Sequence, residues 1–157
     1  MKWITRERPK IDRLACPWLI LRFIDHEAEF LYVPTQDVLS IATTANAIPY
    51  DIPGVELTHD GPLCSFDAFL KKYAINDQAL QQLADIVRAA DTDTLEKSAQ
   101  APGLLAITLG LAANIPDDHA LLQQALIIYD ALYTWCQSLT QQRHGWHPES
   151  RTTGGKS

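Results

Sequence analysis

A cysteine stands directly before a proline in the segment DRLACPWLILRF, residues 12–23, which has arginines near both ends. The residue before a proline disfavours the α conformation, whereas proline is well accepted as the first residue of a helix. The pattern predicts that Cys16 is the N-cap of a helix over residues 17–24. A thiol there lies at the positive end of the helix dipole, which favours the thiolate, and the free N–H groups bind anions. The alternative is a buried core cysteine that packs beside Trp18.

This cysteine belongs to a basic segment of an acidic protein. Residues 1–22 hold six basic and two acidic side chains, whereas the other 135 residues hold seven basic and 17 acidic ones. A basic segment attracts anions; the alternative is that its arginines pair with the protein's own carboxylates. The candidate residues for binding an anion are Arg6, Arg8, Arg13, Cys16 and Arg22.

A second group of side chains has the chemistry of a metal site. His59 precedes Cys64 by five residues, and imidazole and thiolate are ligands that zinc prefers. Two aspartates at 91 and 93 form a pair that suits a divalent cation, and a histidine opens the last predicted helix. The candidate metal ligands are His59, Cys64, Asp91, Asp93 and His119, and a divalent ion is the candidate cofactor.

Ordinary local structure explains the same residues differently, and both interpretations stay open. Asp60 and Gly61 suit a turn before a helix that Ser65 caps. Asp93 and Glu96 have the spacing of a capping box for a following helix.

One acid is unusual because it lies in a strongly apolar part of the last predicted helix. Asp130 stands between Tyr129 and Ala131. A buried carboxylate needs a partner, and the sequence offers Arg13 or Arg22.

The elements that must position these side chains change from extended to helical along the chain. Strands are predicted for KWIT and EFLYVP, and short extended segments for AIPYDI and VELTH. Helical spacing of apolar residues dominates the second half. Helices are predicted after caps at Thr35, Ser65, Asn76 and either Asp117 or Asp118, and over the apolar run 101–113.

This order indicates the α+β class, or a small α/β fold, with an N-terminal sheet layer and a mostly helical C-terminal half. We expect a single domain over residues 1–142. Residues 143–157 are polar and contain glycine, so we expect a flexible tail.

Several classes of protein are disfavoured by what the sequence lacks. It has no apolar run near the roughly 20 residues that span a bilayer and no signal peptide, so we expect no membrane insertion. Three cysteines form no disulfide framework, which favours free thiols in the cytoplasm. No Walker loop, Gly-x-Gly-x-x-Gly or Gly-x-Ser-x-Gly motif is present, and no basic recognition helix is visible.

Four segments, taken in order, carry a resemblance to a known family. They are WITRERPKIDRLACPWLILRFIDHEAEFLYVP, IPYDIPGVELTHDGPLCSFDAFLKKY, IVRAADTD and DDHALLQQALIIYDALY. Together they resemble the C-terminal domain of the ChrB-type chromate resistance proteins. The resemblance implies a role in chromate resistance beside an efflux transporter, with a regulatory or rhodanese-like domain as a partner. Neither partner region is among these 157 residues, so we expect no direct nucleic-acid binding by them.

Two main hypotheses of function follow, and a third is a purely structural partner of a transporter or regulator. The first is a domain that binds or senses chromate or a sulfate-like oxyanion at the basic segment. Chromate is a tetrahedral dianion that suits arginines at a helix N-terminus, and it also oxidises thiols. The alternative is a metal-dependent hydrolase or redox enzyme that uses the histidine, aspartate and cysteine side chains.

Overall fold

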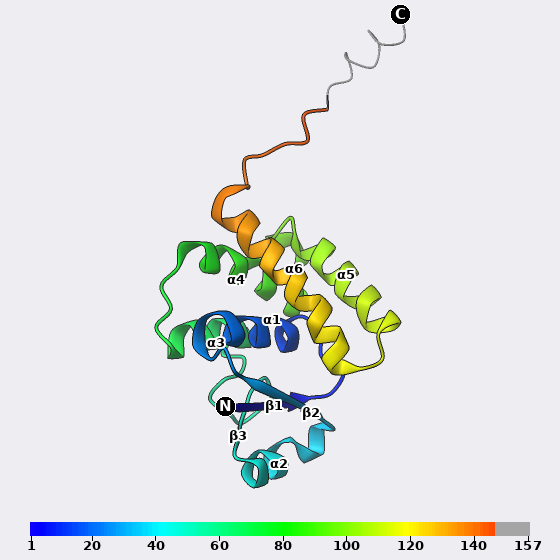
Figure 1. The fold of residues 1–157 in the computed structure, drawn as a ribbon. Coiled ribbons are helices and arrows are strands. Elements are labelled where there is room, and N and C mark those ends of the chain that lie inside the picture. The colour runs from blue at the N-terminus through cyan, green and yellow to red at the C-terminus, as the bar shows by residue number, and fades with distance from the viewer. Residues whose placement is uncertain (147–157) are drawn as a thin grey trace, which may run out of the picture.

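A three-stranded parallel sheet forms the N-terminal layer of the computed structural model, which describes residues 1–146. The strands are β1 (Lys2–Arg6), β2 (Glu29–Val33) and β3 (Ala47–Pro49), in the order β2-β1-β3. Lys2 of β1 is in register with Glu29 of β2 and with Ala47 of β3. Because the strands are parallel, their carboxyl ends lie at one edge of the sheet (Figure 1).

Helical connections join the strands, as parallel pairing requires. The chain from β1 to β2 passes through α1 (Asp12–Leu19) and a π-helical turn (Ile20–Ile24). The chain from β2 to β3 passes through a 3₁₀ turn (Thr35–Asp37) and α2 (Val38–Ala45). Figure 1 shows α2 on one side of the sheet and α1 on the other.

The second half of the described chain is helical and covers the α1 side of the sheet (Figure 1). It consists of α3 (Ser65–Lys72), α4 (Gln78–Asp91), a 3₁₀ turn (Leu95–Lys97), α5 (Ala101–Asn114) and α6 (Asp118–Ser138). Helix α1 contacts α3, α4 and α6, so it lies at the centre of the helical layer. None of the helices within residues 1–146 is both long and apolar enough to cross a membrane.

Alternation along β1 explains why both faces of the sheet are covered. Trp3 and Ile4 are both fully buried, and successive side chains of a strand point to opposite faces. Trp3 packs in the core of the helical layer, with its ring centroid 5.7 Å from that of Phe69. Ile4 packs in a smaller core with Val38 of α2.

The predicted α+β class is confirmed, with the sheet layer at the N-terminus and the helices after it. The segment VELTH was expected to be extended but forms bends that lead towards α3. Residues 147–157 of the predicted tail lie outside the described residues.

The predicted N-cap at Cys16 is wrong. Helix α1 begins at Asp12, so Cys16 lies inside it and Pro17 is an interior residue. Seven of its eight residues are buried, and this packing overrides the local preference of a residue before proline. The proline still has a local effect on hydrogen bonding, because it cannot donate to the carbonyl of Arg13. The helix then continues as a π turn, in which Asp25 donates to the carbonyl of Ile20.

Two further caps differ by one residue from the prediction. Cys64 is the N-cap of α3, because the hydroxyl of Ser65 donates instead to Asp51 at 2.7 Å. Asp77 is the N-cap of α4 in place of Asn76, and its carboxylate accepts the Leu80 N–H at 2.9 Å. For α6 both Asp117 and Asp118 were possible caps, and the structure has Asp117 as the N-cap.

Arg8 ties the β1–α1 connection to the loop between α5 and α6. Its guanidinium donates to the carbonyls of Ala112, Ile115 and Pro116 and to the carboxylate of Asp118, which also accepts the Arg8 N–H. Because these acceptors use the N–H groups of its guanidinium, Arg8 stabilises the fold at this point.

Replacing Arg8 by alanine is therefore expected to destabilise the fold. We expect Arg8→Ala to lower the free energy of unfolding by about 2 kcal/mol, since hydrogen bonds to charged groups are among the stronger ones. Urea unfolding followed by tryptophan fluorescence measures this change. Arg143→Ala is the matched control, because Arg143 is exposed and, within residues 1–146, donates only to carbonyls within three residues. Equal stability of the two variants would contradict this role.

Candidate functional site

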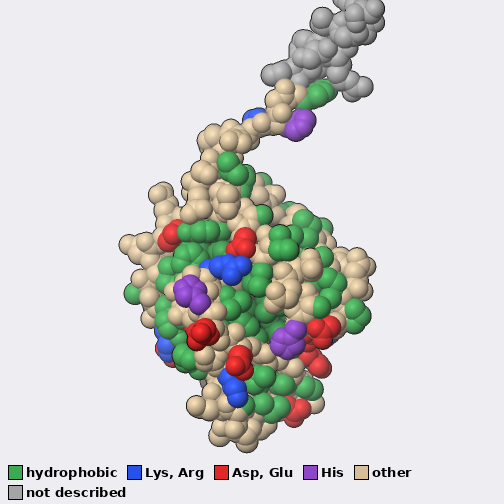
Figure 2. Space-filling model, in the orientation of Figure 1, with side chains coloured by type: hydrophobic (Ala, Val, Ile, Leu, Met, Phe, Trp, Pro, Cys, Tyr) green, Lys and Arg blue, Asp and Glu red, His purple; other side chains and the backbone are tan. Residues whose placement is uncertain are grey.

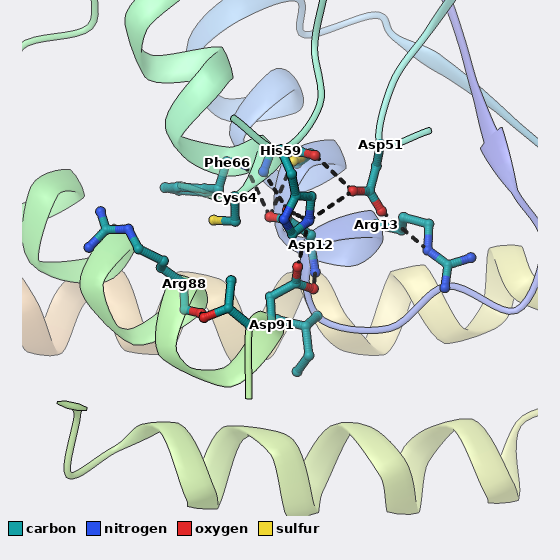
Figure 3. A network of polar contacts seen from close by, with 12 residues as sticks. Asp12, Arg13, Asp51, His59, Cys64, Phe66, Arg88 and Asp91 are labelled. Atoms are coloured by element: carbon teal, nitrogen blue, oxygen red, sulfur yellow. Dashed lines mark hydrogen bonds and ion pairs between the residues drawn. The ribbon is translucent and has the colours of Figure 1, made fainter. Parts of the chain in front are cut away.

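Four side chains from separate segments meet near the carboxyl ends of the strands (Figure 3). Asp12 opens α1, Asp51 follows β3, His59 lies in the loop before α3, and Asp91 ends α4. In parallel sheets, ligands bind in the crevice outside this edge. The four residues therefore lie where parallel sheets usually bind ligands.

The imidazole of His59 is the centre of this group. Its Nε2 lies 2.9 Å from Oδ2 of Asp91, 3.4 Å from Oδ1 of Asp51 and 3.5 Å from Oδ2 of Asp12. The Asp12 side chain is fully buried and that of Asp51 nearly so, whereas 39% of the His59 side chain is exposed. The histidine thus separates the buried carboxylates from solvent. We call these four residues the His59 cluster.

Backbone amides hold Asp12 in its buried position. Its carboxylate accepts the N–H groups of Ser65 at 2.6 Å and Phe66 at 3.1 Å, the first two residues of α3. Such N–H groups have no partner inside the helix and favour a negative charge. The Asp12 N–H donates in turn to Oδ1 of Asp91 at 3.2 Å.

Negative charge is crowded in the cluster. Burial raises the pKa of Asp12 well above its usual range, and the charges of Asp91 and Asp51 raise it further. Burial and then Asp51 raise the pKa of Asp91 as well. The pKa of His59 rises to about 9, chiefly through its hydrogen bond with Asp51, so the imidazole is a cation at neutral pH.

Two arginines lie on the outer side of Asp51. Arg6 and Arg13 each bring a guanidinium nitrogen to 3.5 Å from Asp51 Oδ2. Arg13 also donates to the carbonyls of Arg6 and Glu7, which fix its orientation. The Nε of Arg6 is buried and has no hydrogen-bond partner within the described chain.

An open cavity of about 380 Å³ lies beside these groups. Arg6, Asp51 and His59 line it together with residues of the loop after β3. The cavity gives solvent access to two cations and to one carboxylate of the cluster. We call it the Arg6 cavity; its other lining residues are Ile52, Pro53, Gly54 and Thr58.

The comparisons with known proteins agree with the motifs. Residues 3–136 match the family described as "ChrB, C-terminal domain". The chain belongs to the ChrB C-terminal domain family. A curated relative, Protein ChrB of Cupriavidus metallidurans, is 34% identical over 134 residues, which are 85% of this chain and 40% of that protein. The predicted resemblance to the ChrB-type chromate resistance family is confirmed, and no solved structure matches the chain.

The fold of this ChrB-type domain brings together only some of the residues that were predicted to bind an anion. Arg6 and Arg13 meet at Asp51, whereas Arg8 lies in the α5–α6 contact described above. Arg22 pairs with Asp130 on α6, its Nε at 3.0 Å and its second nitrogen at 2.9 Å. Arg22 is thus the partner that was predicted for Asp130, but this carboxylate is half exposed and not buried as expected.

Cys16 is a core thiol in this fold. Its side chain is fully buried and lies 3.7 Å from Oδ1 of Asp12, to which the thiol donates. Burial, followed by the charge of Asp12, raises the pKa of Cys16 well above its usual range. The thiol is therefore neutral at physiological pH, as in the core-cysteine alternative.

Only some of the predicted metal ligands lie together in the structure. His59 and Asp91 are in contact, but the buried Cys64 donates to Asp67 at 3.3 Å outside the cluster. Asp93 is exposed after the end of α4, and His119 is exposed on α6, with its ring 5.4 Å from that of Tyr32.

Sequence reasoning missed two members of the cluster. Asp12 and Asp51 were not candidates, because single aspartates are common in turns and at helix starts. A usable signal was present: an aspartate follows the apolar run AIPY directly, where a parallel strand would end. Asp12, eight residues after Ile4, becomes a candidate once the strands are known to be parallel.

The buried position of Cys16 makes a prediction about its reactivity. We expect iodoacetamide to modify Cys16 at least about a hundredfold more slowly in the native protein than in guanidinium chloride, because only opened molecules expose the thiol. Peptide mass spectrometry gives the rate at that site. A cysteine at the exposed position of Ser40, in a Ser40→Cys variant, is the control in the same sample. Equal rates at both cysteines would overturn the assignment.

Proposed function

We propose that this chromate resistance domain binds chromate or a similar tetrahedral oxyanion between Arg6 and Arg13, beside the imidazolium of His59. The observation that carries the proposal is that Arg6 and His59 line the Arg6 cavity, while the Arg13 guanidinium lies at the same Asp51 carboxylate as Arg6. Arginine suits a tetrahedral dianion because its fork of N–H groups makes paired hydrogen bonds to two oxygens.

The distances favour an anion that competes with Asp51. Both arginines lie 3.5 Å from the Asp51 carboxylate, which is longer than the 2.7–3.2 Å of a good N–H···O bond. The guanidinium N–H groups of Arg6 and Arg13 therefore lie near a negative charge but make no short hydrogen bond to it. A dianion in the Arg6 cavity would give these donors closer acceptors and would draw the arginines from Asp51.

The proposal assigns binding to the arginines and no electron transfer to the cysteines. All three thiols are buried, and the pKa of each is raised, first of all by burial. Reduction of chromate requires a reactive thiolate or another electron donor. We therefore propose a binding or sensing domain, working in the cytoplasm where free thiols are usual.

We propose that anion binding by this domain acts on a further domain of a longer ChrB-type protein. The chain spans 40% of Protein ChrB from Cupriavidus metallidurans, so that relative has a large additional region. In Figure 2, the lysines and arginines of the described residues are scattered over the visible face and form no continuous stripe there. On this face the distribution favours a small anion over a nucleic acid as the partner, and we propose that other regions make the regulatory contacts.

Arg13→Ala tests the proposal. In a chloride buffer of constant ionic strength, sulfate or chromate at about 100 times its dissociation constant is expected to stabilise the wild-type protein by about 2.7 kcal/mol. We expect Arg6→Ala and Arg13→Ala each to lose most of this stabilisation, as measured by urea unfolding with and without the anion. Arg22→Ala is the control, because its guanidinium binds Asp130 away from the Arg6 cavity. No effect of either anion on the wild type would refute the proposal.

A further inference from the structure

The His59 cluster has a second set of properties that anion binding does not use. Two carboxylates and one imidazole, those of Asp12, Asp91 and His59, bring one ligand atom each within 4.8 Å of one another. We propose that these three side chains form a binding site for a divalent metal ion of the zinc or manganese type. The proposal does not rest on oxyanion binding, because its ligands are Asp12, Asp91 and the Nε2 of His59, and the arginines are not among them.

The spacing of the donor atoms fits one ion. Donors that lie about 2.1 Å from a metal are about 3.0 Å apart at octahedral angles and about 3.4 Å apart at tetrahedral angles. The observed distances from His59 Nε2 are 2.9 Å to Asp91 Oδ2 and 3.5 Å to Asp12 Oδ2. A metal ion would therefore need only small adjustments of side chains.

Backbone N–H groups hold each carboxylate in place, as hydrogen bonds do for the ligands of known metal sites. Asp12 is fixed by the amides of Ser65 and Phe66, and Asp91 accepts the Asp12 N–H through its Oδ1. The second oxygen of Asp91 is left to face the imidazole. Ligands that are themselves hydrogen-bonded keep their orientation, which strengthens metal binding.

The charge of the cluster also favours a cation. Three carboxylates, including Asp51, surround a single imidazole, and Asp12 is completely buried. Buried carboxylates require a cation or a metal to offset the loss of water. A divalent ion would take the place of the proton on Nε2 and bring one more positive charge.

The donor types restrict the class of metal. One imidazole nitrogen and carboxylate oxygens suit Zn²⁺, Mn²⁺ or Fe²⁺ better than a soft ion such as Cu(I). Three protein ligands leave coordination positions open, as in metal sites that bind water or substrate. The partial exposure of His59 at the Arg6 cavity provides a path for the ion from solvent.

Asp51 lies between this site and the arginines. Its Oδ1 is 3.4 Å from His59 Nε2, and its Oδ2 is 3.5 Å from both Arg6 and Arg13. The carboxylate can therefore turn towards a metal if an anion draws the arginines away. The metal site and the anion site are thus adjacent, with His59 between them and Asp51 within reach of both.

Isothermal titration of the chelator-treated protein with ZnCl₂ or MnCl₂, without sulfate or chromate, tests the metal site. We expect one ion per chain, and at least about tenfold weaker binding by His59→Ala and by Asp91→Asn. His59→Ala is the decisive variant if the other is poorly folded, because His59 is partly exposed and holds no helix end. His119→Ala and His144→Ala are the controls, since both histidines are exposed and lie outside the cluster.

The outcomes separate the two proposals. Binding of one ion that depends on His59 supports the metal site, whatever the anion experiment gives. No stoichiometric binding of either ion, or equal affinity of His59→Ala and wild type, overturns the metal site and leaves the oxyanion proposal untouched. Metal affinity that falls only in His144→Ala also overturns it, because the ion would then belong to the C-terminal segment.

Discussion

The buried carboxylate of Asp12 is the contact that joins the helices around the site. It belongs to α1, accepts the first two amides of α3, and its own N–H donates to the last residue of α4. Without it, two N–H groups at the start of α3 would be buried without a partner, at a cost of about 1–3 kcal/mol each. The same carboxylate lies 3.5 Å from His59, so one group fixes both the packing and the site.

Backbone strain is found beside the same residues. Ile11, directly before Asp12, has φ 35°, and Asp51 has φ 53°. Side chains other than glycine rarely adopt positive φ, above all when they are β-branched, and each case costs about 1–3 kcal/mol. Such conformations persist only where surrounding contacts enforce them. Ile11 and Asp51 are two of six such residues in the described chain, and the others, outside the His59 cluster, are Arg8, Asn46, Ala74 and Asp93.

The sequence predicted the order of strands and helices because apolar spacing and proline or glycine signals are local. It failed at Cys16, because burial of α1 overrode the local preference set by Pro17. The site was predicted only in part. His59 and Asp91 were recognised by chemical type, but their contact with Asp12 depends on parallel strand pairing and helix packing, which bring distant segments together. Conversely, Arg8 was selected as a candidate for its charge, but its hydrogen-bond acceptors lie more than 100 residues away, between the end of α5 and the start of α6.

The central claim is that His59 and Asp91 are placed to bind a ligand, whereas Asp12 also holds the helices together. The free energy of unfolding of metal-free Asp91→Asn at pH 7 tests it most directly. Burial and Asp51 raise the pKa of Asp91, so its ionised form opposes folding, and asparagine can still accept the Asp12 N–H. The account predicts a variant as stable as the wild type or more stable. A loss of about 3 kcal/mol or more, typical of breaking a buried ion pair, would contradict it.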